Sequence, residues 1–253
     1  GRVSEGVCIR LYSEQDFNGR TDYTDPEIKR TNLASVILRM LSLGLGDVED
    51  FPYLEPPEQK AINDGFKLLN ELNAINQKRE LTAIGKQMAK LPVDPKLSRM
   101  LVVANTQACL YEVLIIVSAL SIQDPRELSG DFKQQAQERL AVFNHQDSDF
   151  LSLVNLWKDY EQKRQDMTQN QLKKHCKSHF LSFMRMREWR EVHRQLLLSC
   201  QQLGFRLNKE PGTYEAVHRT LIAGSLNQIG NKLDGKNFLG SRNRRFTLFG
   251  SSV

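Results

Sequence analysis

Apolar residues recur along most of this chain at the 3.6-residue period of an amphipathic helix, which predicts a mainly α-helical fold (α+β overall). Between residues 25 and 43, for example, Leu33, Ile37 and Met40 fall on one helical face. The segment 113–120 is apolar almost all round, as expected of a helix that neighbours cover on every side. Outside the hairpin described next, this spacing predicts helices at residues 25–43, 58–72, 82–90, 131–145, 148–163, 182–203 and 213–228.

Two prolines punctuate a helical hairpin at residues 91–126. Asp94 directly precedes Pro95, which places a capping oxygen before a proline at the first helical position, where the missing N–H costs nothing. Asp124 and Pro125 repeat this pair, so we expect another helix to begin there. The pattern thus predicts a buried helix between two sharply defined starts.

Short alternating segments predict strands at three places. Residues 6–12 alternate as a strand does, although a lone strand needs a partner. Residues 74–82 place a polar turn between two apolar pairs, which predicts a two-stranded wing. Near the end, residues 233–240 read as a hairpin and 246–249 as a third strand. Two helices followed by a wing are typical of a winged-helix domain, and the helices at 93–204 form a separate block.

Composition bounds the class of protein. At 253 residues the chain is long enough for two or three modules, and its 40% hydrophobic and 26% charged content is ordinary for a soluble protein. No apolar run approaches the ~20 residues that span a bilayer, and no leader-like segment opens the sequence. The cysteines are scattered, which favours a reducing compartment. We therefore expect a cytoplasmic protein that does not bind membranes.

The net charge of +5 is mild, but it is unevenly distributed. Residues 158–206 carry a net charge of +6 and residues 232–245 carry +4, whereas six acids and one lysine lie between residues 47 and 64. Polarised basic faces attract phosphates. The candidate phosphate contacts are Lys173, Lys174, Lys177, Arg185, Arg187, Arg190, Arg194, Arg242, Arg244 and Arg245.

The competing interpretation of these basic residues is a solvated helix face with pairs such as Arg187–Glu191. As a set, close to a hairpin that offers Phe238 and Phe246 for stacking, they favour nucleic-acid binding. The acidic stretch at 47–64 argues against a phosphate-binding face on the winged helix, for which a structural role is the better reading.

Several kinds of chemistry are excluded by missing motifs. Gly85-Lys86 lacks the upstream glycine and the Ser/Thr of a phosphate loop, and no Asp-Glu-Ala-His segment occurs, so these residues alone should not hydrolyse ATP. His175, Cys176 and His179 share a helical face but lack further ligands at zinc spacing, so we expect no metal site. No nucleophile or carboxylate accompanies the other histidines, His145, His193 and His218.

The sequence of the hairpin resembles that of a known protein family. Leu-Pro-Val-Asp-Pro-x-Leu-x-Arg-Met at 91–100 and Ile-Val-Ser-Ala-Leu-Ser-Ile-Gln-Asp-Pro-Arg-Glu at 116–127 resemble the helicase-associated domain of DEAH-box RNA helicases, and look closest to its bacterial HrpA-type branch. Gly1-Arg2 resembles the end of that family's Gln-Arg-x-Gly-Arg-x-Gly-Arg signature. Phe238-x-Gly-x-Arg-x-x-x-Phe resembles the start of its oligonucleotide-binding (OB) fold, although the family's usual proline before the glycine at 250 is absent.

The resemblance implies a fragment with four parts: the tail of the second RecA-like domain at 1–22, a winged helix at 23–92, a helical ratchet domain at 93–204, and a truncated OB-fold start at 205–253. It implies a parent enzyme that uses ATP and Mg²⁺ to translocate on single-stranded RNA, with this segment closing the RNA channel and coupling motor movement to unwinding. Its partners would be that RNA, free or in ribonucleoprotein or on the ribosome, and the RecA-like motor domains of the same protein. Arg2 would be an arginine finger in the full-length enzyme only. The segment itself would hold no cofactor.

Two other classes stay open on the sequence. One is a free-standing winged-helix protein that binds nucleic acid. The other is a protein-interaction module whose helices dock a partner without enzymatic activity.

Overall fold

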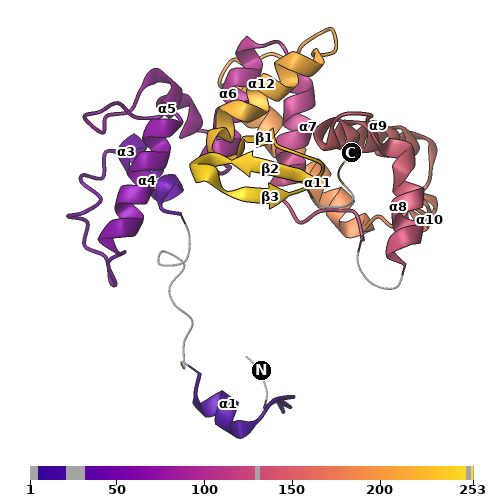
Figure 1. Ribbon diagram of the computed structural model, residues 1–253, viewed down its shortest axis with the longest axis horizontal. Coiled ribbons are helices and arrows are strands. Elements are labelled where there is room, and N and C mark those ends of the chain that lie inside the picture. Colours follow the sequence, from indigo (N-terminus) through magenta and orange to yellow (C-terminus); the bar gives the residue numbers. More distant parts are fainter. Residues whose placement is uncertain (1–4, 21–31, 129–131, 249–251, 253) are drawn as a thin grey trace.

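The computed structural model describes residues 5–20, 32–128, 132–248 and 252, and these residues are mainly helical (Figure 1). A short helix, α1, spans Glu14–Asn18. The other helices gather into an N-terminal three-helix unit and a larger helical block, and a small sheet follows the last helix. The predicted mainly α-helical fold is therefore confirmed.

The N-terminal unit contains α3 (Ala34–Leu43), α4 (Gln59–Glu71) and α5 (Ala83–Met88). Gly44 ends α3 in the left-handed conformation, at φ 65°, as its position after the apolar stripe predicts. The predicted wing is reduced to one bridge between Ile75 and Leu81. Thr82 then caps α5, its Oγ1 accepting from the Gly85 amide at 3.0 Å.

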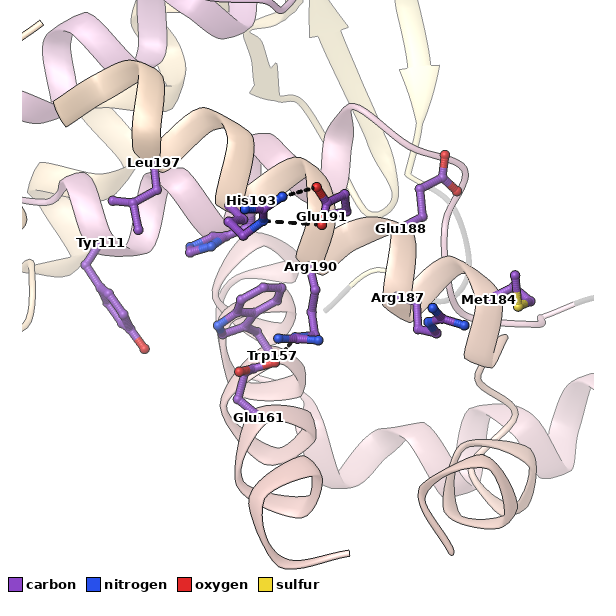
Figure 2. A pocket seen from close by; sticks show the side chains of 11 residues that line it. Tyr111, Trp157, Glu161, Met184, Arg187, Glu188, Arg190, Glu191, His193 and Leu197 are labelled. Atoms are coloured by element: carbon purple, nitrogen blue, oxygen red, sulfur yellow. Dashed lines mark hydrogen bonds and ion pairs between the residues drawn. The ribbon is translucent and has the colours of Figure 1, made fainter. Parts of the chain in front are cut away.

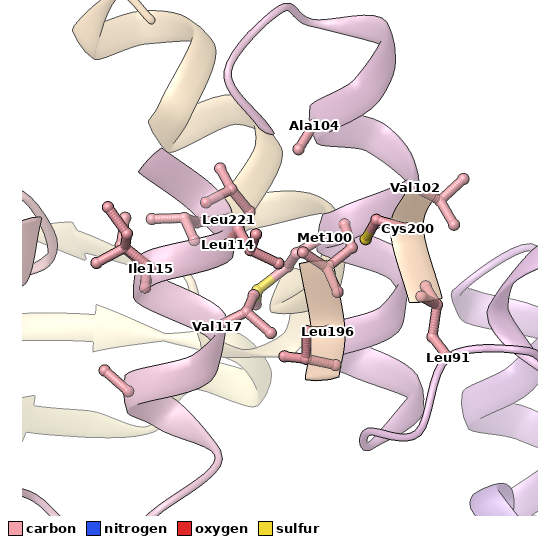
Figure 3. Packing of buried hydrophobic residues seen from close by; sticks show 14 of the residues in the cluster. Leu91, Met100, Val102, Ala104, Leu114, Ile115, Val117, Leu196, Cys200 and Leu221 are labelled. Atoms are coloured by element: carbon pink, nitrogen blue, oxygen red, sulfur yellow. The ribbon is translucent and has the colours of Figure 1, made fainter. Parts of the chain in front are cut away.

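The larger block is built around α6 (Pro95–Thr106) and α7 (Leu110–Leu120). Asp94 caps α6 as predicted, accepting from the Lys96 amide at 2.8 Å, with Pro95 in the first turn. Residues 113–117 of α7 are fully buried, which confirms the prediction from their all-round apolar pattern. Figure 3 shows α7 between side chains of α6, α11 and α12.

The remaining helices of the block are α8 (Lys133–Leu140), α9 (Asp149–Asp166), α10 (Gln169–Ser178) and α11 (Phe183–Gln202). A 3₁₀ turn, η1 (Ala141–Phe143), follows α8. On α11, Trp189 is fully buried and its indole N–H donates to the Ile115 carbonyl at 3.1 Å and to Ser118 Oγ at 2.9 Å. These bonds fix the rotation of α11 against α7.

After Gly204, which ends α11 with φ 77°, the chain forms α12 (Tyr214–Gly224), which packs on α6. The turn η2 (Leu226–Gln228) leads into an antiparallel sheet of order β1-β2-β3, with β1 at Gly230–Lys232, β2 at Asn237–Gly240 and β3 at Arg245–Thr247. Another turn, η3 (Ser241–Asn243), joins β2 to β3. The predicted hairpin and third strand therefore form, with β3 ending at Thr247.

Two of the predicted secondary-structure elements do not form, so these two predictions are wrong. Residues 6–12 form no strand, and Val7, Ile9 and Leu11 are almost fully exposed, because none of the described strands lies beside them. No helix begins at Pro125 either. Instead Asp124 Oδ1 accepts from the Arg126 amide, and the backbone of 125–127 pairs with that of 180–182. Asp124 therefore caps a turn and not a helix. Backbone N–H and C=O groups of residues 125–127, which a helix would use, are hydrogen-bonded to residues 180–182.

Candidate nucleic-acid interface

The arginines of α11 line a groove between that helix and α9. Arg187, Arg190 and Arg194 recur at helical steps, and because Trp189 anchors the opposite face in the core, these side chains point outward. They line a hollow of about 730 Å³ between α9 and α11 (Figure 2). Arg187 and Arg190 also line a second hollow of about 250 Å³. We call these two adjoining hollows the arginine groove.

Arg190 is tied to α9 by an ion pair. Its Nε lies 2.7 Å from Oε1 of Glu161. The same carboxylate accepts from Nε and a terminal nitrogen of Arg164, each at 3.2 Å. One acid therefore holds two arginines from two helices on the wall of the groove.

The other predicted arginines of α11 differ in their partners. Arg194 pairs with Glu191 at 2.7 Å, and Arg185 donates to the Asp124 carbonyl at 3.0 Å. Arg187 is exposed and has no hydrogen bond or ion pair to any residue that the structure describes. The expected alternative pair Arg187–Glu191 is thus wrong, because Glu191 binds Arg194 instead. Arg187 is the free cation of this helix within the described structure.

An aromatic cluster supports the floor of the groove. Trp157 lies against Trp189 at 5.1 Å and against the ring of His193 at 4.5 Å, measured between ring centroids. Burial lowers the pKa of His193 to about 4, and Nε2 of this ring is buried without a hydrogen-bond partner in the described structure. Tyr111 of α7 lines the same hollow. The floor is therefore aromatic and uncharged at neutral pH, while the walls carry charge.

The other predicted basic residues lie elsewhere. Lys173, Lys174 and Lys177 are exposed on α10, and none of them lines the arginine groove. Arg244 and Arg245 are exposed at the start of β3. Arg2 and the side chain of Arg242 lie outside the described residues.

The two phenylalanines expected to stack on bases stack on each other. Phe238 and Phe246 are cross-strand partners with ring centroids 5.6 Å apart and planes 22° apart. The Phe246 ring also covers Gly230, where an added Cβ would lie 2.5 Å from it. Their faces are thus partly occupied by the sheet itself, which leaves α11 with the better-formed candidate interface.

The histidines of α10 make ordinary protein contacts. His175 Nε2 lies 3.5 Å from a carboxylate oxygen of Asp159, and its ring is 4.3 Å from that of His179. Burial and the neighbouring His179 lower the pKa of His175, while Asp159 opposes that shift. In the ranges that the structure describes, no group of three or more His, Cys, Asp or Glu is placed to hold a metal ion.

Trp157, Glu161, Arg164 and Tyr111 line the groove but were not singled out from the sequence. The spacing of Glu161 and Arg164 could have revealed their pairing within α9. Nothing local reveals the pairing of Glu161 with Arg190, because it depends on how α9 lies against α11.

Among the described helices, none has the length and apolar content needed to cross a membrane.

Comparisons with known proteins agree with this architecture. Residues 66–93 match the family described as "Helicase associated domain (HA2), winged-helix", and residues 94–182 match "Helicase associated domain (HA2), ratchet-like". The whole chain is 46% identical to the ATP-dependent RNA helicase HrpA of Escherichia coli and 46% identical to an HrpA homolog of Haemophilus influenzae. It spans 20% of the length of each.

A plant relative is more distant. This relative is a protein of Arabidopsis thaliana described as pre-mRNA-splicing factor ATP-dependent RNA helicase DEAH10, and it is 30% identical to this chain. The match covers 93% of this chain and 34% of the plant protein. The chain therefore carries helicase-associated winged-helix and ratchet-like segments, and over its full length it is homologous to a fifth of a bacterial HrpA-type RNA helicase.

Proposed function

We propose that this chain is an accessory segment of an ATP-dependent DEAH-box RNA helicase, and that its arginine groove contacts the backbone of single-stranded RNA. The observation that carries the proposal is the alignment of Arg187, Arg190 and Arg194 along one outward side of α11, in a hollow of about 730 Å³. Relatives at 46% identity are described as RNA helicases, which makes RNA the fitting polyanion.

The chemistry of the groove suits phosphates more than bases. An arginine offers five N–H donors in a planar fork, which matches the oxygens of a phosphodiester. Arg187 is unpaired among the described residues, and Arg190 keeps donors beyond the one that binds Glu161. Such contacts hold a strand in register without reading its sequence, as a helicase acting on many sequences requires.

The segment would act together with a motor that these residues do not contain. We propose that ATP and Mg²⁺ are used by RecA-like domains of the same protein, and that α11 closes the RNA channel opposite them. When the motor domains move, a helix that grips the backbone would let the strand pass in one direction and resist its return. Arg2 keeps its expected role as an arginine finger only within this proposal.

The winged helix is a weaker candidate for the RNA contact. Its wing is a single bridge, and the exposed segment between α3 and α4 is rich in acids, including Asp47, Glu49 and Asp50. A phosphate backbone would be repelled from this face. A free-standing winged-helix protein, which was the alternative from the sequence, is therefore the less favoured function.

The test measures binding of a fluorescent single-stranded RNA to the 253-residue chain by anisotropy at two or more salt concentrations. We expect Arg187→Ala plus Arg190→Ala to weaken binding about tenfold at low salt. Because two phosphate contacts are lost, the slope of log K against log salt should fall by about 1.4.

The matched control removes the same charge elsewhere, through Arg139→Ala on α8 plus Arg219→Ala on α12, both exposed and outside the groove. Equal losses in the two double variants would mean that only net charge attracts the RNA. Unchanged binding by the groove variant would remove α11 from the interface.

A further inference from the structure

Glu161 is an acid on the wall of a groove that we assign to phosphates. Its side chain is 25% exposed, and its two oxygens accept from Arg164 of α9 and Arg190 of α11. A carboxylate repels a phosphodiester, so Glu161 would weaken phosphate binding unless it also has a favourable effect that offsets this repulsion.

The donors of the two arginines show how the arrangement can work. Arg190 engages Glu161 through Nε, which leaves both terminal nitrogens of its fork free of partners among the described residues. Arg164 uses Nε and one terminal nitrogen and keeps the other. Both arginines line the same hollow, so their remaining N–H groups are at its wall.

The charge of the cluster stays positive. Two guanidinium groups and one carboxylate leave a net charge of +1. Arg187 lines both hollows without a partner in the described structure and adds one positive charge, while the unpaired Glu188 adds one negative charge. The pair of Arg194 and Glu191 is neutral, so the two hollows together carry a net charge of +1. The acid therefore reduces the attraction for a polyanion without cancelling it.

We propose that Glu161 is a positioning residue, which holds Arg164 and Arg190 as a fixed pair across α9 and α11 so that their free N–H groups bind one phosphate of the RNA backbone. The inference rests on the proposed RNA contact and adds the residue that orders it. A long arginine side chain loses conformational freedom when it binds a ligand. Glu161 removes part of that freedom beforehand, so less is lost on binding.

The chain offers a matched control for the charge of Glu161. Glu188 lines the same 730 Å³ hollow and is exposed, but it has no hydrogen bond or ion pair in the part of the chain that the structure describes. Glu188→Ala thus removes one negative charge from the groove without releasing an arginine. It measures the repulsion alone.

The experiment compares E161A, E188A, R190A and the double variant E161A/R190A by anisotropy with single-stranded oligouridylate across a salt series. We expect E188A to bind slightly tighter than the parent chain, with an unchanged salt slope. We expect E161A to bind about threefold more weakly than E188A, with a slope reduced by about 0.7, as for one lost phosphate contact. The double variant should bind like R190A alone.

Two results would overturn the inference. If E161A binds as tightly as E188A with the same slope, Glu161 only repels the strand. If E161A binds more tightly than E188A, and only when Arg190 is present, Glu161 competes with phosphate. By contrast, if R190A itself binds like the parent chain, the RNA does not use this groove and the proposed function fails first.

Folding is kept apart from binding. Loss of fold lowers the active fraction, but it does not change the salt slope of the molecules that remain folded. If E161A has lost its helical circular dichroism, E161Q replaces it. That variant keeps the size of the side chain but not the charge that holds two guanidinium groups, and the same reduction in slope is expected.

Discussion

Helices α7 and α11 lie against each other, yet they use opposite strategies. On α7, residues 113–117 are buried without exception, and its first-turn acid Glu112 is buried as well. On α11, Trp189, Leu196 and Cys200 are buried, while Arg187, Arg190 and Arg194 reach solvent. The comparison shows that α11 exposes a row of arginines while its other side is held against α7. Here α7 forms the buried packing surface, and α11 carries the exposed arginines.

The largest effect should come from the seam between the two helices. Trp189→Ala removes a fully buried side chain and its hydrogen bonds to Ile115 and Ser118, so we expect a loss of about 3–5 kcal/mol in the free energy of unfolding. Urea denaturation measures it. Met184→Ala, on the exposed side of the same helix, should cost less than ~0.5 kcal/mol. If Trp189→Ala lowers the free energy of unfolding no more than Met184→Ala does, the packing of α11 on α7 does not depend on Trp189.

A smaller effect should come from the buried acid of α7. Glu112 accepts from the Gly212 amide and from Asn208 Nδ2, both at 3.1 Å, and it lies in the first turn, where the helix dipole favours a negative charge. Glu112→Ala leaves the Gly212 amide without its acceptor and removes one of the two hydrogen bonds of Asn208 Nδ2, so we expect a loss of about 2–3 kcal/mol in the free energy of unfolding. The exposed Glu191→Ala is the control in the same denaturation series. If both variants are equally stable, the segment 208–212 is not anchored by this acid.

The smallest effect concerns His193 on α11. Burial lowers its pKa to about 4, whereas the unfolded chain has the ordinary value of about 6.5. Between these values the unfolded state binds more protons, so stability should fall as the pH drops from about 6.5 to 4, by roughly 2 kcal/mol. The measurement is the free energy of unfolding of the parent chain and of His193→Gln at several pH values. Parallel curves would show that His193 does not contribute.

Local signals explain most of what the sequence predicts correctly. Asp94-Pro95 predicts the start of α6, and an unbroken apolar run predicts the burial of α7. Neither prediction needs knowledge of the rest of the fold. Thr82 and Gly44 likewise mark helix ends through their own chemistry. The groove arginines were also found, because their spacing on one helix places them on one side.

Contacts between distant residues explain the errors. Asp124-Pro125 has the same local signal as Asp94-Pro95, but the backbone after it pairs with residues 180–182, more than fifty positions away. The partner of Arg190 is Glu161, on another helix, and the phenylalanines of the sheet meet each other. None of these contacts follows from spacing along one element, so they could not be predicted from it. The expected domain limits at 1–22, 23–92, 93–204 and 205–253 stay predictions.

The pairing of residues 125–127 with 180–182 has a mechanical consequence. It joins the segment that leaves α7 to the segment that enters α11, and Arg185 adds a bond from the first turns of α11 to the Asp124 carbonyl. A pull on the arginine end of α11 is therefore shared at once with α7, and through the buried apolar contacts of α7 with α6. A rotation of α11 against α7 at this end would have to break the three hydrogen bonds of this pairing together.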